Sequence, residues 1–366
     1  MLKIKIGEVC DVYDGPHATP KKIDKGPVYL GIDAITDNGK LKPSGYNYLS
    51  EEDYKIWTKR VTPQYGDLVF SYEATLGRYA LIPKDFYGCL GRRLAVVRPK
   101  DERINIKWLY YYFLSPEWSV YIANNTVKGS TVNRISIEDF PNFYIPLLER
   151  TEQDKIVKVL SAIDEKIDNN VNINDNLQSQ LRLIYENMIA KANSNQIKGN
   201  FVTVKEMADI TTGKEDANFS TVNGKYKFFT CSNVPLQCDE YAFESSSILI
   251  AGNGDFNVKY YSGKFNAYQR TYVLTASSEY YAILYLACLY QVNLFKSNSS
   301  GSIVKFITKS DVENIPLFIP DDISLLQKLN NLLHFQEQNI LENDKLIQLR
   351  DFLLPMLMNG QATIDN

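Results

Sequence analysis

Two turns in this 366-residue chain carry side chains that could hydrogen-bond to a polar partner molecule. The first reads SYEATLGRY over residues 71–79, and the second reads AGNGDFNVKYY over residues 251–261. Both follow a short apolar run and combine Gly with a basic residue, Tyr, and Thr or Asn. Arg and Lys donate to guanine, Asn pairs with adenine, and the Thr methyl group can contact thymine. The turns therefore favour contact with nucleic acid, although each alone could be an ordinary solvated turn.

Two further polar patches accompany each turn. Gly91-Arg92-Arg93 and Tyr268-Gln269-Arg270 form one pair, and residues 128–130 and 300–302 form another that suits phosphate contact. Arg93 and Arg270 lead directly into β-rich runs, so either could instead be a buried structural arginine. The predicted DNA-contacting residues are Tyr72, Thr75, Arg78, Arg92, Arg93, Lys128, Asn133, Arg134, Asn253, Asn257, Lys259, Tyr268, Gln269, Arg270, Ser302 and Lys305.

Catalytic motifs are missing from the sequence. None of GxGxxG, GxxxxGK[ST], HExxH or GxSxG occurs, nor does the Asn/Asp-Pro-Pro-aromatic signature of amino-methyltransferases. The run Asp164-Glu165-Lys166 resembles half of a nuclease metal site. It falls on the predicted outer face of a long helix, however, which favours solvated charges. The 5 Cys are scattered without a CxxC and only 2 His occur, so we expect neither a metal site nor an enzyme.

A long helix is predicted from residue 149 to 191, which contain neither Pro nor Gly. Apolar residues recur there with heptad spacing, interrupted at the centre by two Asn, and a second helix over about 323–358 has a similar stripe. We expect the two helices to pair antiparallel, with their polar centres facing each other. Two separate amphipathic helices are the alternative. The predicted seam is Ile156, Leu160, Ile163, Ile167, Asn170, Asn174, Leu177, Leu181, Leu333, Gln336, Ile340, Asn343 and Ile347.

The sequence repeats itself in order after the first helix. FVTVKEMADITTG (201–213) echoes IKIGEVCDVYDG (4–15), and SILIAGNG (247–254) echoes DLVFSYEA (67–74). FNAYQRTYVL (265–274) echoes GCLGRRLAVV (88–97), and SGSIVKFI (300–307) echoes KGSTVNRI (128–135). IPLFIP (315–320) precedes the second helix as FYIPLL precedes the first. The order indicates two copies of one domain, each followed by a helix.

We therefore predict an α+β fold with two duplicated mixed α/β domains separated by two long helices. The predicted bounds are 1–148 and 193–320 for the domains, and 149–192 and 321–366 for the helices. Net charge is −3. The acidic residues concentrate on the helices, so the domains are neutral to mildly basic, which is compatible with DNA contact.

The chain resembles the specificity subunits of type I restriction–modification enzymes. The resemblance covers nearly the whole length and is most specific in EQDKIVKVLSAIDEKI (152–167), LLPMLMNGQ (353–361), GDLVFSYEATLGRYALIP (66–83) and GCLGRRLAVVRP (88–99). The second helix departs from the family pattern, because DDISLLQKL keeps only Gln327 of the usual Glu-Gln pair.

This resemblance implies two target-recognition domains, each reading one half of a bipartite, asymmetric sequence in double-stranded DNA. It implies that the coiled coil sets the unread spacer and docks two modification (methyltransferase) subunits, with restriction (translocase and nuclease) subunits joining them. S-adenosylmethionine, ATP and Mg are expected in those partners, and no cofactor is expected in this chain.

A subunit of another modification or defence system, or a scaffold that binds peptide or polysaccharide, are the alternatives. No apolar run approaches the roughly 20 residues of a membrane span, so we expect no membrane contact and a cytoplasmic protein.

Overall fold

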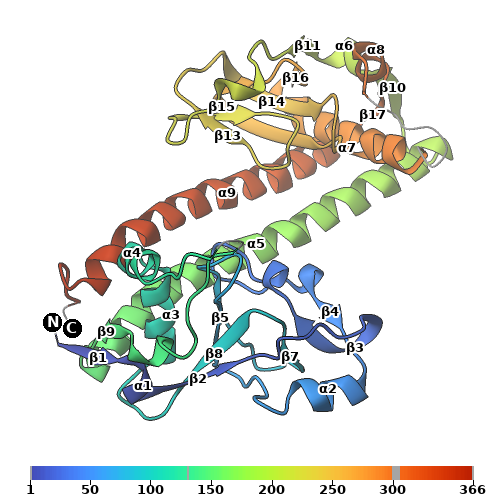
Figure 1. Ribbon diagram of the computed structural model, residues 1–366. Helices are drawn as coiled ribbons and strands as arrows, with labels where there is room; N and C mark the ends of the chain where they lie inside the picture. The colour runs from blue at the N-terminus through green and yellow to red at the C-terminus, as the bar shows by residue number, and fades with distance from the viewer. Residues whose placement is uncertain (1, 130–131, 299–305, 365–366) are drawn as a thin grey trace. The chain divides into compact units, whose positions relative to one another are not determined.

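The protein divides into two compact units, the first built from two segments of the chain and the second from one continuous segment. A computed structural model describes residues 2–129, 132–298 and 306–364, without the side chains of 295–298. The first unit comprises Met1–Ile167 with Lys345–Asn366, and the second comprises Asp168–Asp344. Each unit contains one domain and part of both long helices (Figure 1).

The first unit is built on an antiparallel sheet with strand order β2-β8-β5-β6. Its strands are β2 (Cys10–Asp14), β8 (Leu94–Pro99), β5 (Leu68–Ser71) and β6 (Tyr79–Leu81). The Val, Leu and Phe side chains of β5 and β8 are fully buried, which explains why both runs lack polar alternation. A smaller sheet and a short pair surround it: β4 (Asn47–Tyr48), β3 (Ile23–Leu30) and β7 (Gly88–Leu90), and β1 (Lys3–Lys5) with β9 (Tyr144–Pro146).

Aromatic side chains from two consecutive helices fill the core of the first unit. The two helices follow each other directly, because Ser115 caps a new helix that opens with Pro116. The Phe113 and Trp118 rings on either side of the break stack with centroids 4.3 Å apart. The helices of this domain are α1 (Ile6–Val9), α2 (Glu51–Trp57), α3 (Ile106–Leu114) and α4 (Pro116–Asn124).

The second unit repeats the first sheet in the same strand order. Its sheet runs β11-β16-β14-β15-β12-β13, and its first four strands correspond to β2-β8-β5-β6. The strands are β11 (Asp209–Thr212), β16 (Thr271–Thr275), β14 (Phe243–Ala251), β15 (Val258–Ala267), β12 (Tyr226–Phe229) and β13 (Leu236–Cys238), with β10 (Gly199–Thr203) paired to β17 (Pro316–Pro320). The helices are α6 (Val204–Met207), α7 (Tyr281–Asn298) and α8 (Lys309–Glu313). The shared order confirms the predicted duplication.

The two long helices are α5 (Arg150–Asn193) and α9 (Ile323–Met358). They pair antiparallel, because the second half of α5 contacts the first half of α9 in the second unit. Asn339 donates to the Asn174 side-chain oxygen at 2.8 Å, and Gln336 donates to the Asn174 carbonyl at 2.7 Å. Asn170 donates to Asn343 at 2.9 Å. The polar centres of the two helices therefore face each other, as the sequence predicted.

Burial follows the predicted seam on α5 but not throughout α9. Predicted positions from Ile156 to Leu181 are buried, except Asn174, which is half-buried. On α9, Leu333 and Gln336 are buried, but Ile340 and Ile347 are 45% and 37% exposed, which corrects the prediction for both. Asn339, 6% exposed, takes the inner position. The steps from Leu333 to Gln336 and from Gln336 to Asn339 are both three residues, whereas a heptad alternates steps of three and four, so the buried stripe leaves the strict heptad there.

In the first unit, the beginning of α5 packs against the end of α9. Leu160 and Leu354 share one buried cluster with the domain's aromatic core. Asp164 accepts a hydrogen bond from Tyr111 at 2.7 Å and lies 3.2 Å from Arg350, with its side chain 17% exposed. The expectation that Asp164 is a solvated helix charge is therefore wrong. It links the domain to both helices.

Candidate nucleic-acid interface

Backbone hydrogen bonds bring the three predicted patches of the first domain to one surface. The Tyr72 N–H donates to the Arg93 carbonyl at 3.1 Å, and the Ile135 N–H donates to the Tyr72 carbonyl at 2.7 Å. The Ala74 N–H donates to the Asn133 carbonyl at 3.3 Å. The 71–79 turn therefore lies between the arginine pair on one side and residues 132–135 on the other.

Five of the predicted side chains on this surface are exposed: Thr75, Arg92, Lys128, Asn133 and Arg134. Lys128 and Asn133 also line a hollow of about 510 Å³, together with Gly77 and residues of α4. The combination of Lys, Arg, Asn and Thr at one face supplies donors and acceptors for phosphates and base edges.

Three other predicted contacts are used within the domain itself. Tyr72 is only 4% exposed, so it differs from the expected surface contact. Arg78 turns back to donate to the Ile35 carbonyl at 2.8 Å. Arg93 has a φ of 73° and pairs with Glu73, with 2.9 Å between Nε and Oε1. These side chains hold the loops in place rather than extending from them.

A charged group that the sequence analysis did not identify lies beside Tyr72. Arg60 binds Asp14 through both carboxylate oxygens at 2.7 and 2.9 Å, and His17 Nε2 lies 3.1 Å from the same carboxylate. Burial raises the pKa of Tyr72 to about 12, with smaller contributions from Asp14 and Glu73. The Asp14-Gly15-Pro16 turn was the available sequence signal. Its partner Arg60 lies 46 residues away, beyond any local pattern.

The second domain repeats the same backbone connections. The Gly252 N–H donates to the Arg270 carbonyl at 2.8 Å, and the Ile307 N–H donates to the Gly252 carbonyl at 2.8 Å. Gly252, Arg270 and Ile307 correspond to Tyr72, Arg93 and Ile135 of the first domain, because the surrounding sequences are the echoes identified above. Two predicted contacts, Ser302 and Lys305, lie outside the described residues.

Two of the predicted contacts in the second domain bind each other. Asn257 donates to the Cys231 carbonyl at 2.8 Å and accepts from Lys259. Lys259 also donates to the Thr230 carbonyl at 3.4 Å, and burial lowers the pKa of Lys259 to about 8. Lys259 lines a hollow of about 460 Å³ with Lys227 and part of α9. Its ammonium is therefore held on neutral oxygens, at one wall of that hollow.

The remaining predicted contacts of the second domain differ in how exposed they are and in whether another side chain binds them. Arg270 is exposed, and its side chain has no ion pair within the described part of the chain, so it differs from the paired Arg93. Gln269 is exposed and donates to Asp216 at 2.8 Å. Asn253 and Tyr268 are half-buried. Arg270 is thus the one cation among these four, and it is exposed.

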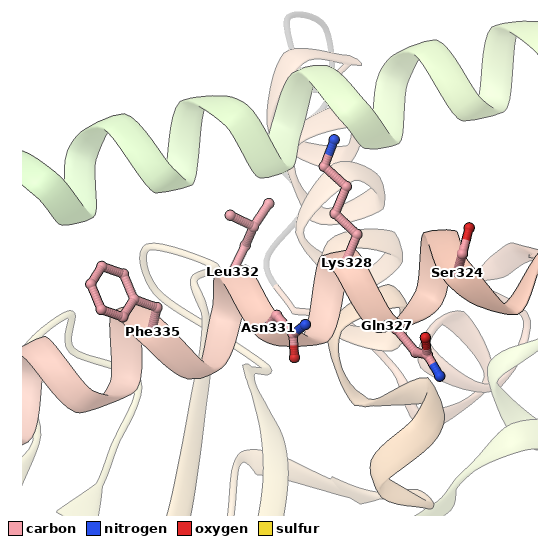
Figure 2. Close-up of a pocket in the computed structure, with 6 residues that line it drawn as sticks. All are labelled: Ser324, Gln327, Lys328, Asn331, Leu332 and Phe335. Atoms are coloured by element: carbon pink, nitrogen blue, oxygen red, sulfur yellow. The ribbon is translucent and has the colours of Figure 1, made fainter.

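A third hollow, of about 470 Å³, lies on α9 and differs from the domain surfaces (Figure 2). All of its lining residues come from that one helix, as the sticks in Figure 2 show, and the only charged group among them is Lys328. None of the predicted DNA contacts lines it, so it is separate from the candidate interface. Within residues 2–129, 132–298 and 306–364, no cluster of three potential metal-ligating His, Cys, Asp or Glu residues forms. In the same ranges, no helix has the length and apolar character of a membrane span.

Comparison with known proteins identifies relatives of the whole architecture. A family model described as the type I restriction modification DNA specificity domain matches residues 2–179 and again residues 196–349. The type I restriction enzyme EcoDI specificity subunit of Escherichia coli is 35% identical over 169 residues, which is 44% of this chain and 38% of that protein. The MjaIX specificity subunit of Methanocaldococcus jannaschii is 22% identical over 364 residues, covering 88% of this chain and 83% of that protein.

A solved structure shares the fold. The crystal structure of a type I restriction–modification system S subunit from M. genitalium matches 98% of this chain and 96% of its own, with a TM-score of 0.61 and 19% identity. The two family matches fall on the two repeats, so the duplication is visible in sequence, fold and family alike.

Proposed function

We propose that this chain, which belongs to the type I restriction modification DNA specificity family, gives a modification complex its DNA sequence specificity. Each domain reads one half of a bipartite, asymmetric target in double-stranded DNA. The chain supplies recognition rather than catalysis. The alignment spans only 38% of the EcoDI subunit, so the target and partners of this chain are proposed from its own residues.

One observation carries the proposal. The same backbone connections join matching loops in both domains, and both sets of loops carry exposed basic and amide side chains. Two similar but non-identical surfaces suit two different half-sites, because side chains at equivalent positions differ. Arg92 stands where the second domain has Gln269, and these residues prefer different base edges.

The paired helices provide the spacer in this proposal. Inserting or removing a heptad in both helices is expected to change the preferred spacer while leaving the half-site sequences unchanged. The helices also dock two modification subunits, which bind S-adenosylmethionine, and restriction subunits that use ATP and Mg join the complex. Two domains of modest DNA affinity that are joined by the helices bind more tightly than either domain alone, because binding of one raises the effective concentration of the other at its half-site.

Methylome sequencing of cells with and without this chain tests the function. Loss of a bipartite methylated-adenine motif on deletion supports the proposal and defines the target. If every methylation mark persists on deletion, in cells where the partner methyltransferase is expressed, the chain does not direct that methylation. Retained binding to peptide or polysaccharide, without salt-dependent DNA affinity, would favour the scaffold alternative.

Single substitutions then test whether each domain reads its own half-site. Lys128→Ala is expected to weaken binding and lower the salt dependence by about one released counterion. Its effect should disappear when only the first half-site is scrambled. Arg270→Ala should behave likewise toward the second half-site. Lys84→Ala, at an exposed turn outside both surfaces, is the matched control. Equal sensitivity to scrambling of either half-site would count against independent readers.

A further inference from the structure

The first domain is attached to α5 at two points by polar side chains. Gln153, fully buried, accepts from the Asn105 N–H at 2.8 Å and donates to the Arg103 carbonyl at 2.7 Å, so it clamps the start of α3. Farther along α3 and α5, the Tyr111 hydroxyl of α3 donates to Asp164 of α5 at 2.7 Å. The α3 helix is thus tied to α5 by an amide at one end and by a tyrosine–carboxylate pair at the other.

The second domain has the same two attachments, built from different residues. Asn330 of α9 accepts from the Ala282 N–H at 2.9 Å and donates to the Glu279 carbonyl at 2.6 Å, at the start of α7. The Tyr281 hydroxyl donates to Glu337 of α9 at 3.1 Å. In both repeats, the long helix that follows the domain carries an amide and, farther along, a carboxylate. Both groups bind the domain helix that follows strand β8 in the first domain or strand β16 in the second.

Two points of attachment fix a rotation that one point leaves free. Gln153 and Asp164 are about 16 Å apart along α5, and Asn330 and Glu337 about 10 Å apart along α9, at 1.5 Å per residue. Both carboxylates are largely buried, with side chains 17% and 16% exposed. A hydroxyl that donates to a carboxylate in such surroundings makes a strong, directional bond.

Both tyrosines remain donors at neutral pH. Burial, followed by the nearby carboxylate, raises the pKa of the Tyr111 and Tyr281 hydroxyls well above the ordinary value for tyrosine. Tyr111 and Tyr281 are only 4% and 9% exposed as whole residues, so the hydroxyls have little access to water as an alternative partner. Each pair therefore depends on the domain keeping its orientation on the helix.

We propose that Tyr111–Asp164 and Tyr281–Glu337 are positioning pairs that hold each domain at one rotation on its helices and thereby restrict the spacer length that the protein accepts. This rests on the proposed function, in which each domain reads a half-site. Adding one base pair moves a half-site by about a tenth of a helical turn. A domain that loses its tyrosine–carboxylate pair is still held by its amide clamp and by the buried cluster that it shares with the helices. It should nevertheless turn more readily to follow that shift than a domain that keeps both polar attachments.

Selection from a random DNA library tests this, with the full chain assembled with its modification subunits. Tyr111→Phe and Tyr281→Phe each keep the ring and remove the hydroxyl. Both are expected to select the wild-type half-site sequences. The share of selected DNA whose spacer is one base pair longer or shorter should rise about fivefold, the size expected for one lost hydrogen bond. The double variant should broaden the spacer distribution further.

Tyr112→Phe is the matched control. Tyr112 is the next residue on α3, is 3% exposed, and its hydroxyl has no hydrogen bond among the described residues. It should keep the wild-type spacer distribution. Spacer distributions of Tyr111→Phe and Tyr281→Phe that match the wild type would overturn the proposal. So would equal broadening by Tyr112→Phe, because that would indicate general loosening of the core.

A second measurement separates failure of this inference from failure of the proposed function. Spin labels at Lys59 and Glu165, both exposed and both in the first unit, report the distance between the domain and α5 in the chain without DNA. Tyr111→Phe should broaden that distance distribution, and Tyr112→Phe should not. If the wild-type complex selects no DNA motif, the proposed function fails. An unchanged distribution in Tyr111→Phe refutes the positioning role independently.

Discussion

Replacing Asn174 by Leu tests the polar contact between α5 and α9 in the second unit. The substitution removes the acceptor for the Asn339 side-chain N–H, a bond of 2.8 Å. Because Asn339 is 6% exposed, water cannot readily replace that acceptor, and an unpaired buried donor costs about 1–3 kcal/mol. The half-buried leucine returns about 1 kcal/mol of apolar burial. We expect Asn174→Leu to lower the free energy of unfolding by about 1–2 kcal/mol.

The double variant Asn174→Leu/Asn339→Leu should recover that loss. With both partners apolar, no buried donor is left unpaired, so its stability should lie within about 1 kcal/mol of the wild type. The two substitutions are therefore expected to be coupled by at least about 1 kcal/mol in a double-mutant cycle. This coupling is the quantity that isolates the contact from the separate effects of adding two leucines.

Urea unfolding followed by two probes measures these changes. Far-UV circular dichroism reports helix loss in both units. The 3 Trp of the chain, Trp57, Trp108 and Trp118, all lie in the first unit, so their fluorescence serves as an internal reference. A single Asn174→Leu variant as stable as the wild type, or a double variant no more stable than Asn174→Leu, would refute the reasoning.

Three further outcomes are expected. Asp67→Asn should destabilise the first unit by about 2–3 kcal/mol in tryptophan-detected urea unfolding, because it leaves Arg98 without the bidentate carboxylate at 2.7 Å; equal stability would contradict this. Leu160→Ala, at a fully buried seam position, should cost about 3 kcal/mol in the same assay, and a loss below 1 kcal/mol would show that the seam is loosely packed. Lys259 has a pKa of about 8, so it loses its charge as pH rises from 7 to 9. The DNA affinity of the wild type should fall over that pH window, whereas the affinity of Lys259→Arg should stay constant. Identical pH profiles for the two proteins would exclude a role for this charge.

The duplication and the helix pairing could be predicted because both leave periodic signals in the sequence. The echo of KGSTVNRI by SGSIVKFI placed Ile135 and Ile307 at equivalent positions, and both donate to the loop after β5 or β14. The α5 seam followed from heptad spacing. The exposure of Ile340 and Ile347 could not be predicted, because the departure from the heptad depends on Asn339 finding a partner on the other helix.

The roles of individual polar side chains were harder to predict. Asp164 has a sequence environment typical of a solvated helix face, and only the distant Tyr111 and Arg350 make it a buried junction. Tyr72 and Arg78 have residue types suited to DNA contact, but both face inward. Residue type indicates what a side chain can bind. Whether it reaches solvent depends on backbone connections between loops tens of residues apart.

The division of the first unit into two chain segments affects how it can fold during synthesis. Leu354, Leu357 and Met358 complete the same buried cluster as Ile156 and Leu160. Nearly 200 residues separate these two groups, so at 5–20 residues per second the ribosome delivers the covering segment roughly 10–40 s after the first. During that interval the apolar face of α5 is uncovered on the nascent chain. A chaperone that shields this face, or a translational pause that lengthens the interval, would therefore affect the yield of the correctly folded first unit more than that of the second unit.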